Sequence, residues 1–150
     1  MKICIACSAG GHLIESMRLL PILEKYDVFY FTFFVQHLKK TLKKYRTHFT
    51  VNPKRNPIKF MRVIFDSLKV LIKEKPKVII STGAGVTIPI CILGKLLLRS
   101  KIIYIECSAQ VYKPSLTGRV IYFIADLFFV QWKYLLRVYG TRAIYGGLLI

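Results

Sequence analysis

Short apolar runs rich in β-branched and aromatic residues alternate along this chain with segments of helical periodicity. Strands that take turns with helices predict right-handed β–α–β crossovers and a parallel sheet covered on both faces. Strands that are apolar throughout, such as KIIYI at 101–105, fit a sheet buried on both faces. The sequence therefore predicts a single Rossmann-like α/β domain spanning residues 1–150.

The same pattern places the individual elements. The expected strands lie at 2–7, 28–33, 49–51, 78–81, 102–105 and 127–130, with a short one near 143–145. The expected helices lie at about 12–25, 36–45, 58–74, 86–98, 116–125 and 132–138. Pro21 falls inside the first helix and should kink or split it, because proline removes one hydrogen bond of the helical ladder.

Length and composition bound the size and the location of the protein. A chain of 150 residues suits one domain, which buries roughly 70% of the surface of the unfolded chain. The hydrophobic share of 54% is high, yet no segment reaches the roughly 18 uncharged apolar residues of a membrane-spanning helix. The start, MKICIACSAGG, has too short an apolar stretch for a signal peptide. We therefore expect a cytoplasmic protein.

The four cysteines do not form a metal-binding or disulfide framework. Cys4 and Cys7 have CxxC spacing, but both fall in the first predicted strand, where residues three apart point to opposite faces. A redox CxxC normally follows the strand, and a zinc site needs a second pair of ligands. Buried free thiols are the favoured interpretation, and no metal site is expected.

Charge is the most unusual property of the chain. It carries 24 Lys and Arg residues against 7 Asp and Glu residues, a net charge of +17, and the stretch from 39 to 62 is basic without one acidic residue. This balance favours a polyanionic partner: nucleic acid, an anionic bilayer or a phosphorylated substrate. A solvated basic surface is the alternative.

Ligands of a parallel α/β sheet bind at the carboxyl ends of its strands, so the strand-to-helix loops carry the candidate chemistry. The first loop, SAGGH at 8–12, matches neither GxGxxG nor a P-loop. Gly10 and Gly11 can adopt backbone angles closed to other residues and bring N–H groups close to an anionic ligand. His12 then opens a helix, whose dipole disfavours the protonated imidazole and keeps it available as a base. A histidine that only caps the helix is the alternative.

Two further loops add to this edge of the sheet. STGAGV at 81–86 repeats the arrangement with Gly83 and Gly85, although glycines also permit close strand–helix packing. Two such loops favour a shared cleft for phosphate or sugar. In ECSAQVYKPSLTG at 106–118, Glu106 can accept hydrogen bonds from sugar hydroxyls or orient a histidine; its alternative role is a structural acceptor for loop amides. Ser115 should cap the next helix.

Together, CSAGGH, STGAGV, IYIECSA, SLTG, ADLFFVQW and the terminal YGG resemble the asparagine-linked-glycosylation protein fourteen family and its bacterial relatives of the PssD/CpsF type in capsule and exopolysaccharide synthesis. These motifs occur in order and span nearly the whole chain. More distantly, the same stretches resemble the N-terminal half of MurG, the lipid-linked N-acetylglucosamine transferase. There the glycine-rich loop ends in GGH, and a glutamate stands where Glu106 stands.

The resemblance implies half of a GT-B glycosyltransferase, in which two Rossmann-like domains enclose the reaction cleft. This chain would be the acceptor-side half, and a separate donor-binding subunit would complete a heterodimer. The complex would move a sugar, with inversion, from a nucleoside diphosphate sugar to a polyprenyl-diphosphate-linked saccharide, with no metal or other cofactor. The family's C-terminal tail is implicated in holding the partner, which assigns to that interface Tyr145, Gly146, Gly147, Leu148, Leu149 and Ile150.

Within that reaction, one base must deprotonate the acceptor hydroxyl. His12 is the leading candidate, and Glu106 would orient the acceptor sugar or His12; which of the two is the base stays open. The residues expected to face the substrate and its diphosphate are Ser8, Gly10, Gly11, Gly83, Gly85 and Ser108.

The family's eukaryotic members carry an N-terminal membrane anchor, which this sequence lacks, so attachment to the inner face of the membrane would be peripheral. The predicted helix at 58–74 combines a charged stripe with an apolar shoulder, which suits a headgroup boundary, each basic side chain contributing about 1 kcal/mol on anionic lipid. A helix buried over a wide arc is the alternative. The stripe contains Arg62, Asp66, Lys69 and Lys73, and the shoulder contains Ile58, Phe65 and Ile72.

Two functions of other classes remain as rivals. The chain could be a non-catalytic membrane scaffold or enhancer of a partner transferase that holds the complete chemistry. A basic nucleic-acid-binding module would also fit the net charge, but no recognition-helix motif or aromatic RNA-binding sheet surface is evident. We therefore expect no nucleic acid partner.

Overall fold

The computed structural model describes residues 1–36 and 38–149, and within them the chain forms one seven-stranded sheet. Every strand pair is parallel, and the strand order is β3-β2-β1-β4-β5-β6-β7. This confirms the predicted parallel α/β fold and its seven strands, although β3 begins three residues earlier than expected. The strands are β1 (Lys2–Ala6), β2 (Asp27–Phe33), β3 (Arg46–Thr50), β4 (Val78–Ser81), β5 (Lys101–Ile105), β6 (Leu127–Val130) and β7 (Ala143–Tyr145).

The helices follow the expected alternation, but several are shorter than predicted. The first predicted helix is split into two, with Pro21 in the first turn of the second, where its missing N–H costs nothing. The predicted helix at 36–45 is a single turn, and the one at 116–125 ends at Ile121. The helices are α1 (Gly11–Met17), α2 (Leu20–Leu23), α3 (Leu38–Thr41), α4 (Pro57–Glu74), α5 (Ile88–Leu98), α6 (Leu116–Ile121) and α7 (Tyr134–Tyr139), with a 3-10 turn η1 (Gly85–Thr87) before α5.

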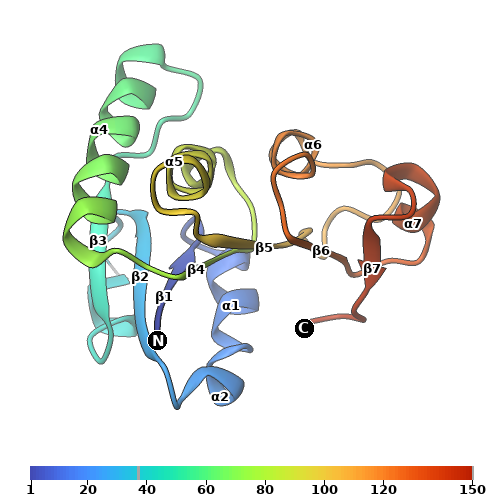
Figure 1. The fold of residues 1–150 in the computed structure, drawn as a ribbon, viewed down its shortest axis with the longest axis horizontal. Helices are drawn as coiled ribbons and strands as arrows, with labels where there is room; N and C mark the ends of the chain where they lie inside the picture. The colour runs from blue at the N-terminus through green and yellow to red at the C-terminus, as the bar shows by residue number, and fades with distance from the viewer. Residues whose placement is uncertain (37, 150) are drawn as a thin grey trace.

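The sheet separates two apolar layers. Figure 1 shows α4, α5 and α6 on one side of it and α1 and α2 on the other. Because side chains alternate along a strand, Cys4 packs into the first layer and Ile3 and Cys7 into the second. Cys4 and Cys7 are thus buried free thiols on opposite faces, as predicted. Burial raises the pKa of Cys7 to about 12, which keeps that thiol protonated and inert.

Helix α5 approaches the sheet closely because it carries a glycine at its contact with β4. A Cβ added to Gly94 would lie 2.3 Å from Cδ1 of Ile79, so any larger residue would push the helix away. This packing fixes the direction in which the chain leaves β4 and enters η1 and α5. The loop between β4 and α5 is one wall of the candidate site.

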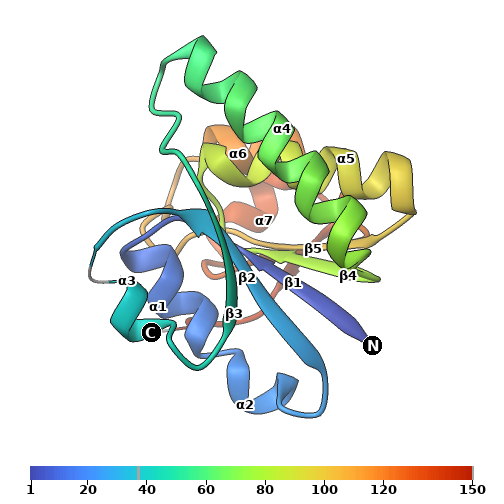
Figure 2. The ribbon, with the colours of Figure 1, turned by 90° about the vertical axis from the view of Figure 1, so that its left-hand side faces the viewer.

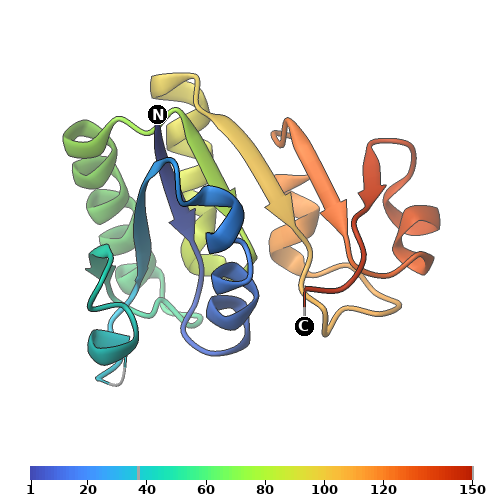
Figure 3. The ribbon, with the colours of Figure 1, turned by 90° about the horizontal axis from the view of Figure 1, so that it is seen from below.

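The two faces of the sheet are not covered equally. Seen from below, α1 and α2 lie in front of the centre of the sheet, whereas no described helix lies in front of β5, β6 and β7 (Figure 3). A parallel sheet normally has both faces covered, so this part of the lower face is unusual. No helix among residues 1–36 and 38–149 is both long and apolar enough to cross a membrane.

Candidate functional site

The candidate site lies at the point where the strand order reverses. β1 and β4 are neighbours in the sheet, but the chain leaves β1 toward α1 on one face and leaves β4 toward η1 and α5 on the other. Loops that diverge in this way open a crevice at the carboxyl ends of the strands, where open α/β sheets bind ligands. The structure therefore brings the loops at 8–12 and 81–86 together, as predicted.

His12 links the two loops through its side chain. Its Nδ1 lies 2.7 Å from the carbonyl oxygen of Thr82, and the hydroxyl of Thr82 donates to the His12 carbonyl at 2.8 Å. Because a carbonyl oxygen can only accept, Nδ1 carries the proton of the neutral ring and Nε2 carries a lone pair. The half-buried imidazole is thus held in one tautomer and is not used to cap α1.

Only two of the four loop glycines adopt the backbone angles expected of glycine. Gly10 and Gly83 have φ of 98° and 113°, whereas Gly11 and Gly85 simply begin α1 and η1. Gly83 has a second role, because a Cβ there would lie 2.9 Å from Cε1 of His12. The expected unusual backbone angles were therefore wrong for Gly11, whereas Gly85 begins the tight turn into a helix that was predicted. Ala84, beside Gly85, takes the unusual angle, with φ of 77°.

Glu106 is fully buried at the end of β5 and accepts hydrogen bonds from the loop and helices that follow. Its partners are the backbone N–H groups of Cys107 (3.0 Å) and Ser115 (3.2 Å), the hydroxyls of Ser115 (3.1 Å) and Tyr104 (3.3 Å), and the hydroxyl of Tyr139. Gly118 leaves room for this cluster, since a Cβ there would lie 2.2 Å from the Tyr139 oxygen and 2.3 Å from Oε2 of Glu106.

The chemistry of this cluster is structural. Burial, together with the hydrogen bond to Glu106, raises the pKa of Tyr139 well above its ordinary value, so the phenol remains a donor. Ser115 caps α6 as predicted, because its Oγ accepts from the Gly118 N–H at 2.8 Å. Among the described residues no hydrogen bond joins Glu106 to His12. Glu106 accepts from loop amides, which is the alternative recognised in the sequence, and it does not orient His12 through a direct hydrogen bond within this part of the chain.

The carboxylate beside His12 is instead Glu15, which the sequence analysis missed. Glu15 lies one turn after His12 on α1 and is only 2% exposed. Its Oε1 accepts from the backbone N–H of Ser108 at 2.8 Å, and its Oε2 has no hydrogen-bond partner among the described residues. Donor atoms of His12, Glu15 and Cys107 all lie within 4.8 Å of one another. The sequence did contain a signal for Glu15: it follows His12 by three positions, which places both on one face of a helix, and the chain has only seven acidic residues.

An imidazole, a carboxylate and a thiol this close are donor types that also bind zinc. Burial raises the pKa of the Cys107 thiol, and the charges of Glu15 and Glu106 raise it further. Two of the donor atoms are already engaged, because Nδ1 of His12 donates to the Thr82 carbonyl and Oε1 of Glu15 accepts from the Ser108 N–H. We therefore assign no metal role to the cluster.

The remaining predicted substrate residues surround His12 at different depths. Gly10, Gly11 and Gly85 are exposed at the rim, whereas Gly83 is buried behind the imidazole ring. Ser8 is buried, and its hydroxyl donates weakly to the Ala9 carbonyl at 3.4 Å. Ser108 joins the site through its backbone N–H, which Glu15 holds.

Helix α4 exposes the apolar shoulder predicted for it. Ile58, Phe65 and Ile72 are 80%, 58% and 62% exposed, while the buried face of the helix is formed by other residues, including Val63 and Val70. The side chain of Arg62 is 70% exposed beside this shoulder, and Lys69 is exposed as well. The first turns of α4 project beyond the sheet (Figure 2). The alternative of a helix buried over a wide arc therefore does not hold for these three apolar residues.

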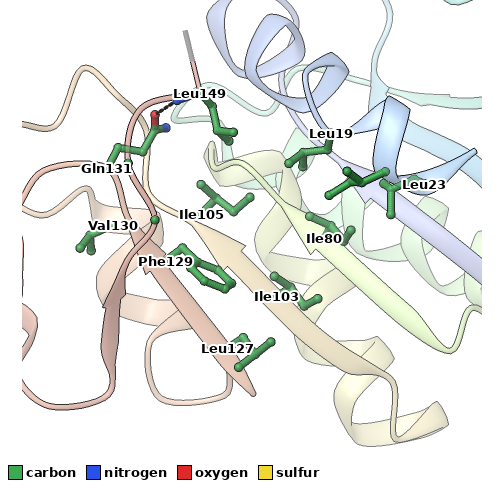
Figure 4. A pocket seen from close by; sticks show the side chains of 13 residues that line it. Leu19, Leu23, Ile80, Ile103, Ile105, Leu127, Phe129, Val130, Gln131 and Leu149 are labelled. Carbon is green, nitrogen blue, oxygen red and sulfur yellow. Dashed lines mark hydrogen bonds between the residues drawn. The ribbon is translucent and has the colours of Figure 1, made fainter.

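A separate apolar groove of about 340 Å³ lies on the uncovered part of the sheet (Figure 4). Strands β4, β5 and β6 form its floor, Leu19 and helix α2 form one wall, and the C-terminal tail forms the other. The tail is held in place because Gln131 Oε1 accepts from the Leu149 N–H at 2.7 Å. The lining includes Ile22, Leu23, Ile80, Ile103, Leu127, Phe129, Gly146, Gly147 and Leu149.

The residues predicted to hold a partner divide between rim and groove. Tyr145 ends β7 and is exposed, as are Gly146 and Leu148, whereas Leu149 is half-buried. Ile150 lies outside the described residues. The tail thus borders the groove, and the two features form one continuous surface.

Comparison with known proteins identifies several whose sequences are similar to this chain. The family described as "Oligosaccharide biosynthesis protein Alg14 like" matches residues 52–149. The UDP-N-acetylglucosamine transferase subunit ALG14 of Candida albicans is 39% identical over 99 residues, which cover 63% of this chain and 44% of that protein. Its human counterpart is 30% identical over 89 residues, covering 56% of this chain and 41% of that protein. The match thus spans less than half the length of these curated relatives.

Solved structures show the same fold at low sequence identity. MurG of Acinetobacter baumannii superposes with a TM-score of 0.78 at 14% identity, over 98% of this chain and 45% of MurG. The UDP-GlcNAc 2-epimerase of Neisseria meningitidis, bound to UDP-GlcNAc, superposes with a TM-score of 0.74 at 14% identity, over 99% of this chain and 47% of the epimerase. The chain therefore has the fold of one half of a GT-B enzyme, as predicted.

Proposed function

Because this chain belongs to the Alg14-like family of oligosaccharide biosynthesis proteins, we propose that it is one subunit of a two-part inverting glycosyltransferase. The relatives are named UDP-N-acetylglucosamine transferase subunits, which makes UDP-N-acetylglucosamine the proposed donor. The solved structures of this fold are about twice as long as the part that superposes. We propose that a separate donor-binding subunit supplies the other half, and that this chain holds a polyprenyl-diphosphate-linked acceptor sugar.

The observation that carries this proposal is the fixed tautomer of His12. With Nδ1 donating to Thr82, Nε2 has a lone pair that can take the proton of an acceptor hydroxyl. As that O–H bond breaks, the hydroxyl oxygen forms a bond to the anomeric carbon of the donor sugar. The bond from that carbon to the diphosphate breaks with its electron pair, and the nucleoside diphosphate leaves. The proton on His12 then passes to water.

The surrounding loops have supporting roles in this scheme. The exposed backbone at Gly10, Gly11 and Gly85 can approach a diphosphate without interference from side chains. Ser8 lies in the loop that precedes His12, and the backbone N–H of Ser108 donates to Glu15 on the same helix as His12. Glu106 holds the loop after β5 in place, because a buried carboxylate with several donors fixes each of them. Its catalytic contribution is therefore indirect, and His12 is the proposed base.

The apolar groove is the proposed surface for the donor-binding subunit. The part of the sheet that no described helix covers on this face suits a partner, because parallel sheets are normally covered on both faces. The C-terminal tail, which the family resemblance assigns to the interface, forms one wall of the groove. A patch of this kind marks an interaction site in a folded protein. The groove and the C-terminal tail are therefore proposed to form one interface with the donor-binding subunit.

Reconstitution tests the two-part architecture. The partner to be tested is a short α/β protein with a sugar-nucleotide site, sought in the reading frames next to that of this chain. The assay measures transfer from radiolabelled UDP-N-acetylglucosamine to polyprenyl diphosphates that bear one sugar. We expect the mixture to be active and each protein alone to be inactive, because each holds only one side of the cleft. Substantial turnover by the partner alone would instead identify this chain as a scaffold or enhancer.

Membrane attachment through α4 predicts a further result. Charge reversal at Arg62 and Lys69 to Glu should weaken co-sedimentation with anionic phosphatidylglycerol vesicles by about tenfold or more, because each basic group contributes about 1 kcal/mol. Reversal of Arg119 and Arg137, exposed on α6 and α7, is the matched control with the same change in net charge. Equal losses in both pairs would mean that net charge alone drives binding and that α4 is not the membrane surface.

A further inference from the structure

We propose that Glu15 is a positioning residue for His12: it fixes the loop after β5 against α1 and places one negative charge beside the imidazole. This inference rests on the proposed role of His12 as the base. Glu15 does not contact the substrate in this scheme and acts through its neighbours. Neither the sequence motifs nor the relatives' names assign it a role.

One carboxylate oxygen of Glu15 is occupied by a structural contact. Oε1 accepts the Ser108 N–H at 2.8 Å, which ties α1 to a loop 93 residues further along the chain. The same loop is anchored from the other side, because the indole N–H of Trp132 donates to the Ser108 carbonyl at 2.6 Å. Glu15 therefore cannot rotate away from His12 without releasing this loop.

The environment of the other carboxylate oxygen of Glu15, Oε2, is unusual. Oε2 is buried and accepts no hydrogen bond from an N–H or O–H group among the described residues, and the weakly donating Cys107 thiol is a neighbour of this carboxylate. Glu15 forms no ion pair within that part of the chain. A buried carboxylate without a compensating partner is costly, and such groups are characteristic of sites where charge develops during a reaction. The group placed to provide that charge is His12, whose ring nitrogen lies within 4.8 Å of the carboxylate.

This arrangement gives Glu15 a defined task during transfer. When His12 takes the acceptor proton on Nε2, the imidazolium has one donor already satisfied by Thr82 and carries a full positive charge. A fixed negative charge beside it stabilises this state more than the neutral ring, so it lowers the barrier rather than strengthening substrate binding. Glu106 does not serve this purpose, because its oxygens are committed to the cluster around Tyr139.

The Glu15→Gln variant separates the charge from the structural contact. The Gln carbonyl still accepts from Ser108 N–H, so the loop stays in place while the negative charge is removed. We expect the kcat of the reconstituted complex to fall by about 10- to 100-fold with little change in the KM of the acceptor. Glu24→Gln, an exposed change of the same net charge, is the matched control and should leave both parameters unchanged. Wild-type kcat in Glu15→Gln would overturn the inference.

Cys107 provides a second measurement that does not depend on transfer activity. Its thiol is half-buried, whereas the other three cysteines are buried, and the ionisable groups that face it are Glu15, Glu106 and His12. Burial is the main cause of its raised pKa, and the Glu15 carboxylate adds to it. Removing that charge should increase the thiolate fraction and speed alkylation by iodoacetamide at pH 8 by about 3- to 10-fold. Cys107→Ser serves as the blank.

The transfer assay and the alkylation assay distinguish a failure of the proposed function from a failure of the role inferred for Glu15. A wild-type complex that transfers no sugar would contradict the proposed function, and the alkylation rates would still decide whether Glu15 carries its charge in this cluster. Equal alkylation of the wild type and Glu15→Gln would show that no negative charge acts there, and would overturn this inference while leaving the proposed function intact.

Discussion

His12→Ala is expected to lower the kcat of the reconstituted complex by about 10²- to 10⁴-fold, which is the usual contribution of a positioned general base. The reason lies in the hydrogen bond between Nδ1 and the Thr82 carbonyl, which leaves Nε2 as the proton acceptor. Alanine supplies no proton acceptor, and Oε1 of Glu15 is already engaged by the Ser108 N–H. The measurement is initial-rate transfer with saturating donor and acceptor.

Ile14→Ala is the matched control for this experiment. Ile14 lies two residues further along α1, and its side chain is exposed, so the truncation is similar in size but outside the crevice. Partner binding should be unchanged in both variants, because His12 is not part of the groove. If His12→Ala turned over at the wild-type rate, the base would have to be another group and the proposed mechanism would be wrong.

Asp substitutions in the apolar groove are expected to have a large effect on binding of the donor-binding subunit. Ile22 and Leu127 line it and are 71% and 42% exposed in this chain, so replacing both with Asp should not disturb the fold. A partner seated on them would have to bury two unpaired charges, each costing several kcal/mol. We expect the association constant, measured by calorimetry with the donor-binding subunit, to fall by about 10³-fold or more.

Asp substitutions at Leu116 and Phe123 control for this result. Both residues are exposed on α6 or directly after it, on the opposite face of the sheet, so they change charge and apolar surface equally. Binding should be retained in that pair. Loss of binding in the control but not in the groove variant would place the interface on the α6 face instead.

The sequence predicted elements well because the strands are apolar throughout and their spacing is regular. The sequence did not predict the strand order, because paired residues of neighbouring strands such as β1 and β4 are 75 positions apart and meet only in the tertiary fold. Helix lengths were overestimated around 36–45 and 116–125, where apolar residues pack into the core from turns rather than from helices. Leu42, buried just beyond α3, is one example.

The site was predicted in outline but not in its electrostatics. Glycine pairs and a histidine after strands can be recognised locally, and they do meet at β1 and β4. The partners of an acidic residue are set by the three-dimensional packing: Glu106 faces Tyr139, which is 33 residues away, and Glu15 faces Ser108, which is 93 residues away. Sequence position alone therefore did not show which carboxylate lies beside His12.

The uncovered lower face of β5, β6 and β7 should affect the solubility and abundance of the chain before it assembles with its partner. Before it binds its partner subunit, newly synthesised protein would expose this apolar strand surface. Chaperones and proteases recognise exposed apolar surfaces of this kind. We expect its abundance to follow the supply of the second polypeptide, so that overproduction alone yields insoluble or degraded material and joint production rescues it. The amount of working enzyme would then be governed by whichever half is scarcer.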